Sequence, residues 1–345
     1  MSKRETLKLH RWLGIALLVP LLLQTTTGLM LVYKWPLAQW LDPQGMQRAS
    51  TSATIGAGHI ADRAAATWSD AQLQRLYFPD SAAGTFFLLL QKPGGEKYYA
   101  SVDPGDGRVL RAGSRWQFPV EAALQLHFQP LPGWPGNIVV LLTGAGLLAL
   151  AGVGVMAWWP RPGRWRQGLL IRRGLRTRLM VRQIHRTLGL VLLPVLVVLA
   201  ATGGLMALEI ALQNTAPGAA APQPAPPAAT GARVDAAVTL AQSVVPGARL
   251  RDISFPAGNI KVQFHAPERN PRAVHSVLLG GTPLQVLAHL PAQESTAWWV
   301  TLLPIHSGDI LSPWGNRIVL GAGICLLVLC SLGAWLWLPD RAHRG

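Results

Sequence analysis

The sequence predicts an α-helical membrane protein with four transmembrane helices, arranged as two parallel repeats that each contain a helix, a small α+β domain and a second helix. Half of the 345 residues are hydrophobic and only 14% are charged, which is typical of membrane proteins. A helix needs about 20 apolar residues to cross the hydrocarbon core. Four runs reach this length: Trp12 to Tyr33, Ile138 to Trp159, Thr187 to Leu212 and Ile318 to Leu338.

The distribution of positive charge predicts how these helices are oriented. The formal net charge is +15, and the lysines and arginines gather before the first run, between the second and third, and after the fourth. An even number of crossings puts these segments on one side, which the positive-inside rule makes cytoplasmic. The basic excess therefore indicates a multi-pass membrane protein with both termini cytoplasmic, and no nucleic-acid partner. The residues concerned are Lys3, Arg4, Lys8, Arg11, Arg161, Arg164, Arg166, Arg172, Arg173, Arg176, Arg178, Arg182, Arg186, Arg341 and Arg344.

An internal duplication relates the two halves of the chain. Each unit begins with a His-Arg pair followed two positions later by Leu-Gly, and each has a second histidine ten residues before an asparagine. Both units start on the cytoplasmic side, so we expect parallel repeats related by a pseudo-twofold axis along the membrane normal. The matching positions are His10 and His185, Gly14 and Gly189, Gly28 and Gly203, His127 and His306, and Asn137 and Asn316.

These patterns divide the chain into eight segments. We expect the N-terminus and first helix at 1–34, the first outer domain with its interfacial histidine segment at 35–136, and the second helix at 137–160. A basic cytoplasmic loop at 161–186 and the third helix at 187–213 follow. An Ala/Pro-rich linker at 214–232, the second outer domain with its histidine segment at 233–316, and the fourth helix with the C-terminus at 317–345 complete the chain.

The two outer domains are predicted to share one order of elements. In the first we expect a helix at 53–69 and strands near Leu76, at 85–90, at 97–102 and at 108–110, with the turn DPGDG before the last strand. In the second we expect a helix at 234–245 and strands at 250–255, 260–265 and 274–279. The turn GGTP replaces the acidic turn there.

The histidines are the candidate ligands. The pseudo-twofold would bring His10 to the depth of His185 near the cytoplasmic surface, and His127 to the depth of His306 near the outer surface. Two imidazoles that face each other suit the axial positions of a haem iron. Arg11 and Arg186 could bind the haem propionates, while Gly14 and Gly189, like Gly28 and Gly203, could give the porphyrin clearance. No Cys-x-x-Cys-His is present, so any haem would be non-covalent.

Each of these features also has a simpler interpretation. A single histidine at the start of a span often contacts lipid headgroups, and a duplication copies residues whatever their role. Glycine is common in membrane helices, where it serves helix packing. Arg11 and Arg186 are also explained as orientation signals.

The quoted motifs resemble the PepSY-associated transmembrane family. LHRWLG and IHRTLG open two spans, LHFQP and PIHSGD precede the others, and WWP and WLP close them. The resemblance implies an inner-membrane protein with four helices and two small α+β PepSY-like periplasmic domains. Some members are haem-containing ferrisiderophore reductases, so it also implies that His10, His127, His185 and His306 ligate two b haems. The second domain departs from the pattern because it lacks the acidic turn.

Electron transfer across the lipid bilayer to a periplasmic ferric siderophore or other iron(III) chelate is the function that these expectations favour. No nucleotide-binding fingerprint is present, so the electron donor would be a separate flavin or nicotinamide enzyme, or a quinol. The alternative is a membrane-anchored periplasmic binding or regulatory module without redox activity. A transporter is disfavoured because the spans hold almost no ionisable residues apart from Glu209.

Overall fold

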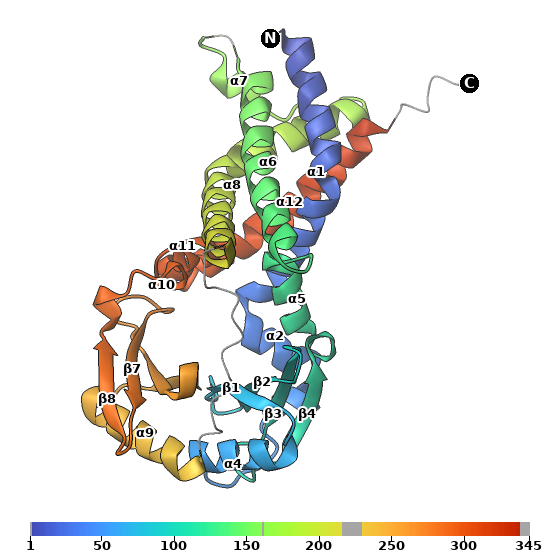
Figure 1. Ribbon diagram of the computed structural model, residues 1–345. Coiled ribbons are helices and arrows are strands. Elements are labelled where there is room, and N and C mark those ends of the chain that lie inside the picture. Colours follow the sequence, from blue (N-terminus) through green and yellow to red (C-terminus); the bar gives the residue numbers. More distant parts are fainter. Residues whose placement is uncertain (1, 161, 216–229, 339–345) are drawn as a thin grey trace. The chain divides into compact units, whose positions relative to one another are not determined.

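The computed structural model describes residues 2–160, 162–215 and 230–338. They form two compact units. The helical unit draws on 1–32, 123–219 and 302–345, and the sheet unit on 33–122 and 220–301 (Figure 1). Most of the predicted Ala/Pro-rich linker lies outside the described residues, as do Arg161, Arg341 and Arg344.

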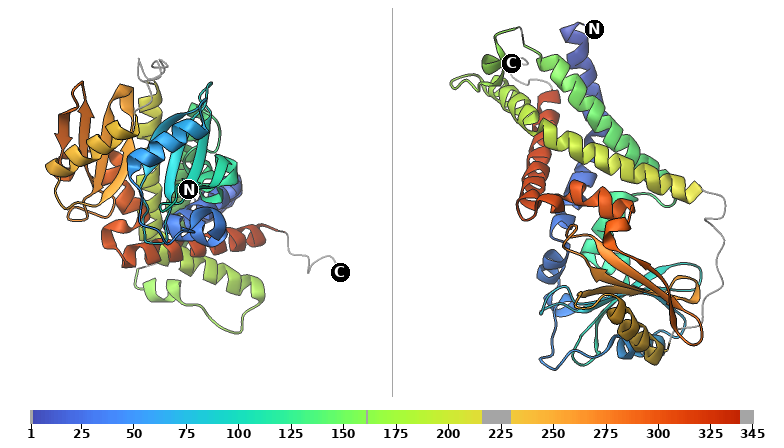
Figure 2. Two further views of the ribbon diagram at one scale, coloured as in Figure 1. Left: turned by 90° about the horizontal axis from the view of Figure 1, so that it is seen from below. Right: turned by 90° about the vertical axis from the view of Figure 1, so that its left-hand side faces the viewer.

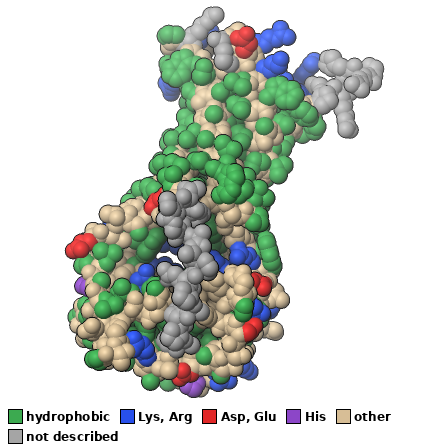
Figure 3. All heavy atoms as spheres, in the orientation of Figure 1, with side chains coloured by type: hydrophobic (Ala, Val, Ile, Leu, Met, Phe, Trp, Pro, Cys, Tyr) green, Lys and Arg blue, Asp and Glu red, His purple; other side chains and the backbone are tan. Residues whose placement is uncertain are grey.

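Four long helices build the helical unit: α1 (Lys3–Val32), α6 (Trp134–Trp158), α8 (Thr177–Thr215) and α12 (Trp314–Trp337). Each is long and apolar enough to cross a membrane, so the prediction of four membrane-spanning helices is confirmed. Both α1 and α8 pack against α6 and α12, an arrangement that can be followed in Figure 2. Hydrophobic side chains make up much of the visible surface of this unit, and Lys and Arg side chains lie at its upper end (Figure 3), as expected for helices that face lipid.

Short helices complete the helical unit. Helix α5 (Pro119–Phe128) and helix α11 (Leu303–Ser307) carry His127 and His306. They form within the histidine segments that the sequence places at the end of each outer domain. Helix α7 (Trp165–Leu169) lies in the basic loop. Helix α10 (Trp298–Thr301), which precedes α11 in the chain, belongs to the sheet unit.

The sheet unit contains one antiparallel sheet of eight strands in the order β4-β3-β2-β1-β5-β6-β7-β8. Strands β1 to β4 come from the first outer segment and β5 to β8 from the second. Their bounds are Gln72–Tyr77, Phe86–Gln91, Lys97–Val102, Val109–Ser114, Leu250–Ser254, Ile260–His265, Val274–Gly280 and Gln285–Leu290. Because β1 pairs with β5, the expectation of two separate outer domains is corrected: the two α+β halves share one sheet.

Strand β8 is absent from the sequence prediction. Every residue of this strand is exposed, so its sequence lacks the alternation of buried and exposed positions that indicates a strand. It follows the GGTP turn and pairs with β7. The other predicted strands agree with the structure to within a few residues at their ends.

Two helices cover one face of the sheet. Helix α4 (Ala57–Thr67) packs over a core that includes Leu76, Phe86 and Leu88, and helix α9 (Gly231–Val244) packs over Ile253 and Phe264. Within the described residues this unit also contains α2 (Lys34–Leu41), α3 (Pro43–Met46) and α10.

Helices α4 and α9 also cap each other. The Asp235 carboxylate accepts a hydrogen bond of 2.8 Å from the Gly58 amide in the first turn of α4, and the Asp62 carboxylate accepts one of 2.6 Å from the Gly231 amide that begins α9. A carboxylate at a helix N-terminus accepts a hydrogen bond from an amide that has no partner within the helix, and its negative charge interacts favourably with the positive end of the helix dipole. The reciprocal contacts therefore bind the two halves of the sheet unit together.

The acidic turn between β3 and β4 is organised around Asp103. Its carboxylate is fully buried and accepts hydrogen bonds from the amides of Ala49, Ser50 and Gly105 at 2.6, 3.0 and 2.8 Å. Burial opposes the charge of this carboxylate, but the hydrogen bonds from Ser50, Gly105 and Ala49 outweigh it and hold the pKa of Asp103 well below its ordinary value.

We expect Asp103→Asn to destabilise the sheet unit by on the order of 2 kcal/mol near neutral pH, because buried amides lose a charged acceptor. The folded-state pKa is depressed, so the stabilisation is present above the unfolded-state pKa of about 4 and is lost as the pH falls below it. Thermal unfolding of the wild type and Asp103→Asn between pH 7 and pH 3 should show that the difference in stability between them becomes smaller toward pH 3. Asp106→Asn, in the same turn but exposed, is the control; an equal loss there would contradict this account.

Candidate functional site

The structure brings the four candidate histidines together in two pairs. His10 of α1 lies beside His185 of α8, with ring centroids 6.2 Å apart. His127 of α5 lies beside His306 of α11, with centroids 6.1 Å apart. All four belong to the helical unit. These are the pairs that the repeat predicts.

Helix α1 determines which nitrogen of His127 is free. The Nδ1 atom lies 3.0 Å from the Gln24 carbonyl oxygen and 3.2 Å from the Thr27 hydroxyl. The Thr27 hydroxyl donates its own proton to the Leu23 carbonyl at 2.7 Å. Both neighbours of Nδ1 therefore act as acceptors, so Nδ1 carries the proton in the neutral ring. The lone pair is left on Nε2, the form in which histidine binds a metal.

The second repeat reproduces this arrangement at His306. Its Nδ1 lies 3.0 Å from the Thr202 hydroxyl on α8, and that hydroxyl donates to the Val198 carbonyl at 2.6 Å. The threonine again serves as an acceptor for Nδ1–H. His306 is thus also prepared to offer Nε2.

A backbone carbonyl has the same role at His10. Its Nδ1 lies 3.2 Å from the Leu150 carbonyl oxygen of α6, and a carbonyl can only accept, so Nδ1 again carries the proton. Leu329 of α12, at the equivalent position, is the backbone neighbour of His185, but within the described residues the buried Nδ1 of His185 has no hydrogen-bond partner. Each pair takes its two imidazoles from different repeats.

Glycines form the surfaces against which the rings rest. A Cβ atom at Gly28 would lie 2.9 Å from Cε1 of His127, and one at Gly203 would lie 3.0 Å from Cε1 of His306. At Gly154 and Gly333 the corresponding distances to His10 and His185 are 3.2 and 3.3 Å. At the first two positions a larger residue would displace the ring.

The other predicted site residues lie differently. A Cβ atom at Gly14 or Gly189 would meet a leucine side chain of a neighbouring helix at 3.9 Å, so neither glycine touches a histidine. The side chain of Arg11 is exposed. Arg186 is partly buried and donates to the Leu170 carbonyl at 3.1 Å. Their predicted roles toward haem stay predictions.

Sequence reasoning did not identify the residues that contact the histidine rings at Thr27, Thr202, Gly154 and Gly333. The threonines precede Gly28 and Gly203 at the same repeat offset as the first histidines, and this signal could have found them. The two glycines follow the offset of the second histidines, but Gly144 and Gly323 do the same without touching a ring.

The spacing within each pair fits one metal ion between two imidazoles. A metal–imidazole nitrogen bond is about 2 Å long and the ring centre lies about 1 Å beyond the nitrogen, so two rings on opposite sides of one ion have centroids about 6 Å apart. Within the described part of the chain, no group of three or more His, Cys, Asp or Glu side chains could hold a metal. Each pair has two imidazoles, the number of axial ligands in a bis-histidine haem site.

The remaining histidines of the described residues do not join the pairs. His59 and His289 are exposed, and His275 accepts a hydrogen bond from the Ala292 amide at Nδ1 and donates one from Nε2 to the Glu268 carboxylate at 2.8 Å. Cys325 and Cys330 are both free.

Together the four long apolar helices and the sheet unit define a multi-pass membrane protein with a separate antiparallel sheet domain. The chain belongs to the family described as the PepSY-associated TM region, whose model matches residues 7–340. It is also similar to the uncharacterized protein PA4219 of Pseudomonas aeruginosa, with 28% identity over 259 residues. That match covers 65% of this chain and 64% of the relative.

Proposed function

We propose that this protein is a di-haem b electron-transfer protein of the bacterial inner membrane, which passes electrons across the membrane to periplasmic iron(III)–siderophore complexes and so acts as a ferrisiderophore reductase in iron uptake. The observation that carries this proposal is the presence of two symmetric imidazole pairs whose centroids are 6.2 and 6.1 Å apart. The structure of each pair fits bis-histidine ligation, and two pairs give two sites.

The chain itself prepares the ligands. Hydrogen bonds to Gln24, Thr27, Thr202 and Leu150 fix ring orientation and keep the Nδ1 proton in place, while the glycines allow the rings to approach the helices. A haem held by such a pair supplies a one-electron redox centre whose potential depends on its ligands and surroundings.

The charge distribution supports the proposed orientation of the chain in the membrane. The basic residues around the ends of α1, α8 and the loop between α6 and α8 favour a cytoplasmic location for those ends, so the sheet unit would face the periplasm. The electron donor would be a cytoplasmic flavin or nicotinamide enzyme or a membrane quinol.

The test is the visible spectrum of the detergent-purified full chain, oxidised and dithionite-reduced, with haem quantified per chain. We expect about two haem b per chain with the sharp reduced bands of low-spin iron, and reoxidation on addition of a ferric siderophore. A protein that stays colourless when haem is supplied during expression would contradict the proposal. That result would favour a membrane-anchored periplasmic binding or regulatory module.

A further inference from the structure

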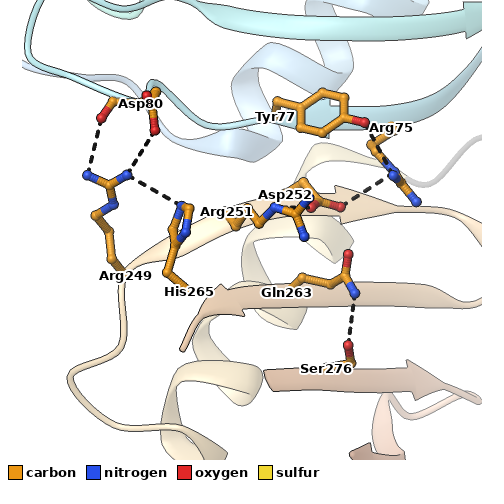
Figure 4. Close-up of polar contacts among 9 residues, drawn as sticks. All are labelled: Arg75, Tyr77, Asp80, Arg249, Arg251, Asp252, Gln263, His265 and Ser276. Carbon is orange, nitrogen blue, oxygen red and sulfur yellow. Dashed lines mark hydrogen bonds and ion pairs between the residues drawn. The ribbon is translucent and has the colours of Figure 1, made fainter. Parts of the chain in front are cut away.

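The middle of the sheet carries a cluster of charged side chains that the histidine pairs do not use. Arg75 of β1 and Arg251 and Asp252 of β5 meet where the two halves of the sheet join (Figure 4). Arg75 and Asp252 lie on the face away from α4 and α9, because their neighbours Leu76 and Ile253 point into the helix-covered cores. The register shift between Leu250 and Asp252 interrupts the alternation at Arg251, whose Nε lies 3.6 Å from the Asp252 carboxylate. We call Arg75, Arg251 and Asp252 the seam cluster.

Positive charge exceeds negative charge in the seam cluster. Two guanidinium groups share the single carboxylate of Asp252, with Nε–carboxylate distances of 3.5 Å from Arg75 and 3.6 Å from Arg251. These distances exceed those of good hydrogen bonds. Burial raises the pKa of Asp252, against the opposing effect of the two arginines. Lys261 and Arg272 add further positive potential nearby.

Aromatic rings hold the two guanidinium groups in place. The Arg251 guanidinium lies 5.4 Å from the centre of the Trp299 ring, and that of Arg75 lies 5.6 Å from the Tyr77 ring and donates to the Tyr77 hydroxyl at 3.2 Å. Such contacts restrict the side chains. Arg251 engages Asp252 through Nε, and within the described residues neither Nη atom of Arg251 has a hydrogen bond.

The arginines of the seam cluster are partly exposed to solvent, whereas the polar groups beside them are buried. The side chains of Arg75 and Arg251 are 34% and 28% exposed, whereas Asp252 is fully buried. Beside Arg75 on the adjacent strand, Ser254 has a buried hydroxyl without a partner in the described part of the chain. Donors in excess of acceptors therefore converge on one partly exposed spot.

We propose that the seam cluster binds an anionic iron(III) chelate with outward-facing carboxylates, of the polycarboxylate type, through the guanidinium groups of Arg75 and Arg251. Guanidinium forks match carboxylate oxygens in charge and spacing, and two fixed forks distinguish such a ligand from an uncharged chelate. This inference rests on the proposed function for the identity of the metal, and it narrows the class of substrate.

Binding of gallium(III) citrate to the full-length protein in detergent tests the proposal, because gallium is not reduced and binding is read apart from electron transfer. We expect saturable binding that weakens at least tenfold in Arg75→Gln and Arg251→Gln and several-fold in Arg251→Lys, which keeps the charge but loses the fork. Arg249→Gln is the matched control: the charge change is the same, but Arg249 pairs with Asp80. Its affinity should stay within about twofold of the wild type, since surface ion pairs have small effects.

Four results would overturn the proposal. They are no saturable binding by the wild type, an equal loss in the Arg249→Gln control, wild-type affinity in Arg251→Lys, and equal competition by free citrate or inorganic phosphate. A gallium(III) tris-hydroxamate without net charge should not compete. Melting temperatures identify a variant that fails to fold. If a glutamine variant does not fold, the affinity of Arg251→Lys for gallium(III) citrate tests the proposal instead.

Haem content separates this proposal from the proposed function. Two haems per chain without arginine-dependent binding would support the redox function and contradict the seam site. A colourless protein that binds gallium(III) citrate through both arginines would support the seam site and contradict the redox function.

Discussion

Replacing His10 or His185 by alanine is expected to remove the same haem, and replacing His127 or His306 is expected to remove the other. Each single variant should retain about one haem per chain instead of two, because a low-spin bis-histidine site fails when either ligand is lost. The 6.2 and 6.1 Å centroid separations within the pairs are the reason for this grouping. Haem quantification with reduced-minus-oxidised spectra is the measurement.

The controls come from the same chain. His59→Ala changes an exposed histidine of the sheet unit and should leave both haems in place. A combination of His10→Ala with His185→Ala should look like either single variant, whereas His10→Ala with His127→Ala should be colourless. If His10→Ala and His185→Ala left different residual spectra, the pairing across the repeats would be wrong.

Alanine at Gly28 or Gly203 is expected to damage the His127–His306 site without unfolding the protein. The new Cβ would lie 2.9 or 3.0 Å from a histidine Cε1, which is closer than van der Waals contact, so the ring must shift. The helix itself tolerates the change, because alanine favours helix more than glycine does. By analogy with other groups that orient a metal ligand, we expect a loss of haem affinity of about 10–100-fold.

Gly321→Ala is the matched control for this prediction. It makes the same change in another membrane helix, where a Cβ atom would have nothing within 4 Å. Haem titration of each variant, with the melting temperature as a check on folding, gives the comparison. Wild-type affinity and an unchanged spectrum in Gly28→Ala would contradict the role assigned to this glycine.

The membrane helices were the most predictable part of the fold. Length and apolar composition are local properties, and they were enough to locate α1, α6, α8 and α12. Pairing of β1 with β5 was not predictable in this way, because the two strands are far apart in the sequence and neither carries a signal that names its partner. Strand β8 escaped prediction because its exposed residues lack the periodicity that burial on one face imposes.

Part of the candidate site was also visible in the sequence. The repeat offset matched His10 with His185 and His127 with His306, and the structure brings both pairs together. The sequence could not show that Thr27 and Thr202 accept from the ring nitrogens, because hydroxyl orientation depends on the packing of α5 and α11 against α1 and α8. For the same reason, Gly14 and Gly189 were equal candidates with Gly28 and Gly203.

The shared sheet has a consequence for how the protein matures. Arg75 in β1 pairs with Ser254 in β5, which leaves the ribosome roughly 180 residues later, on the order of ten seconds or more at ordinary rates of synthesis. Until then β1 is the open edge of a four-stranded sheet, with unpaired amides and carbonyls that other strands can join. Two more membrane helices must be inserted before the chain can close this edge with its own β5. In a protein truncated after α6, β1 would stay an unpaired edge strand, and we expect that protein to aggregate.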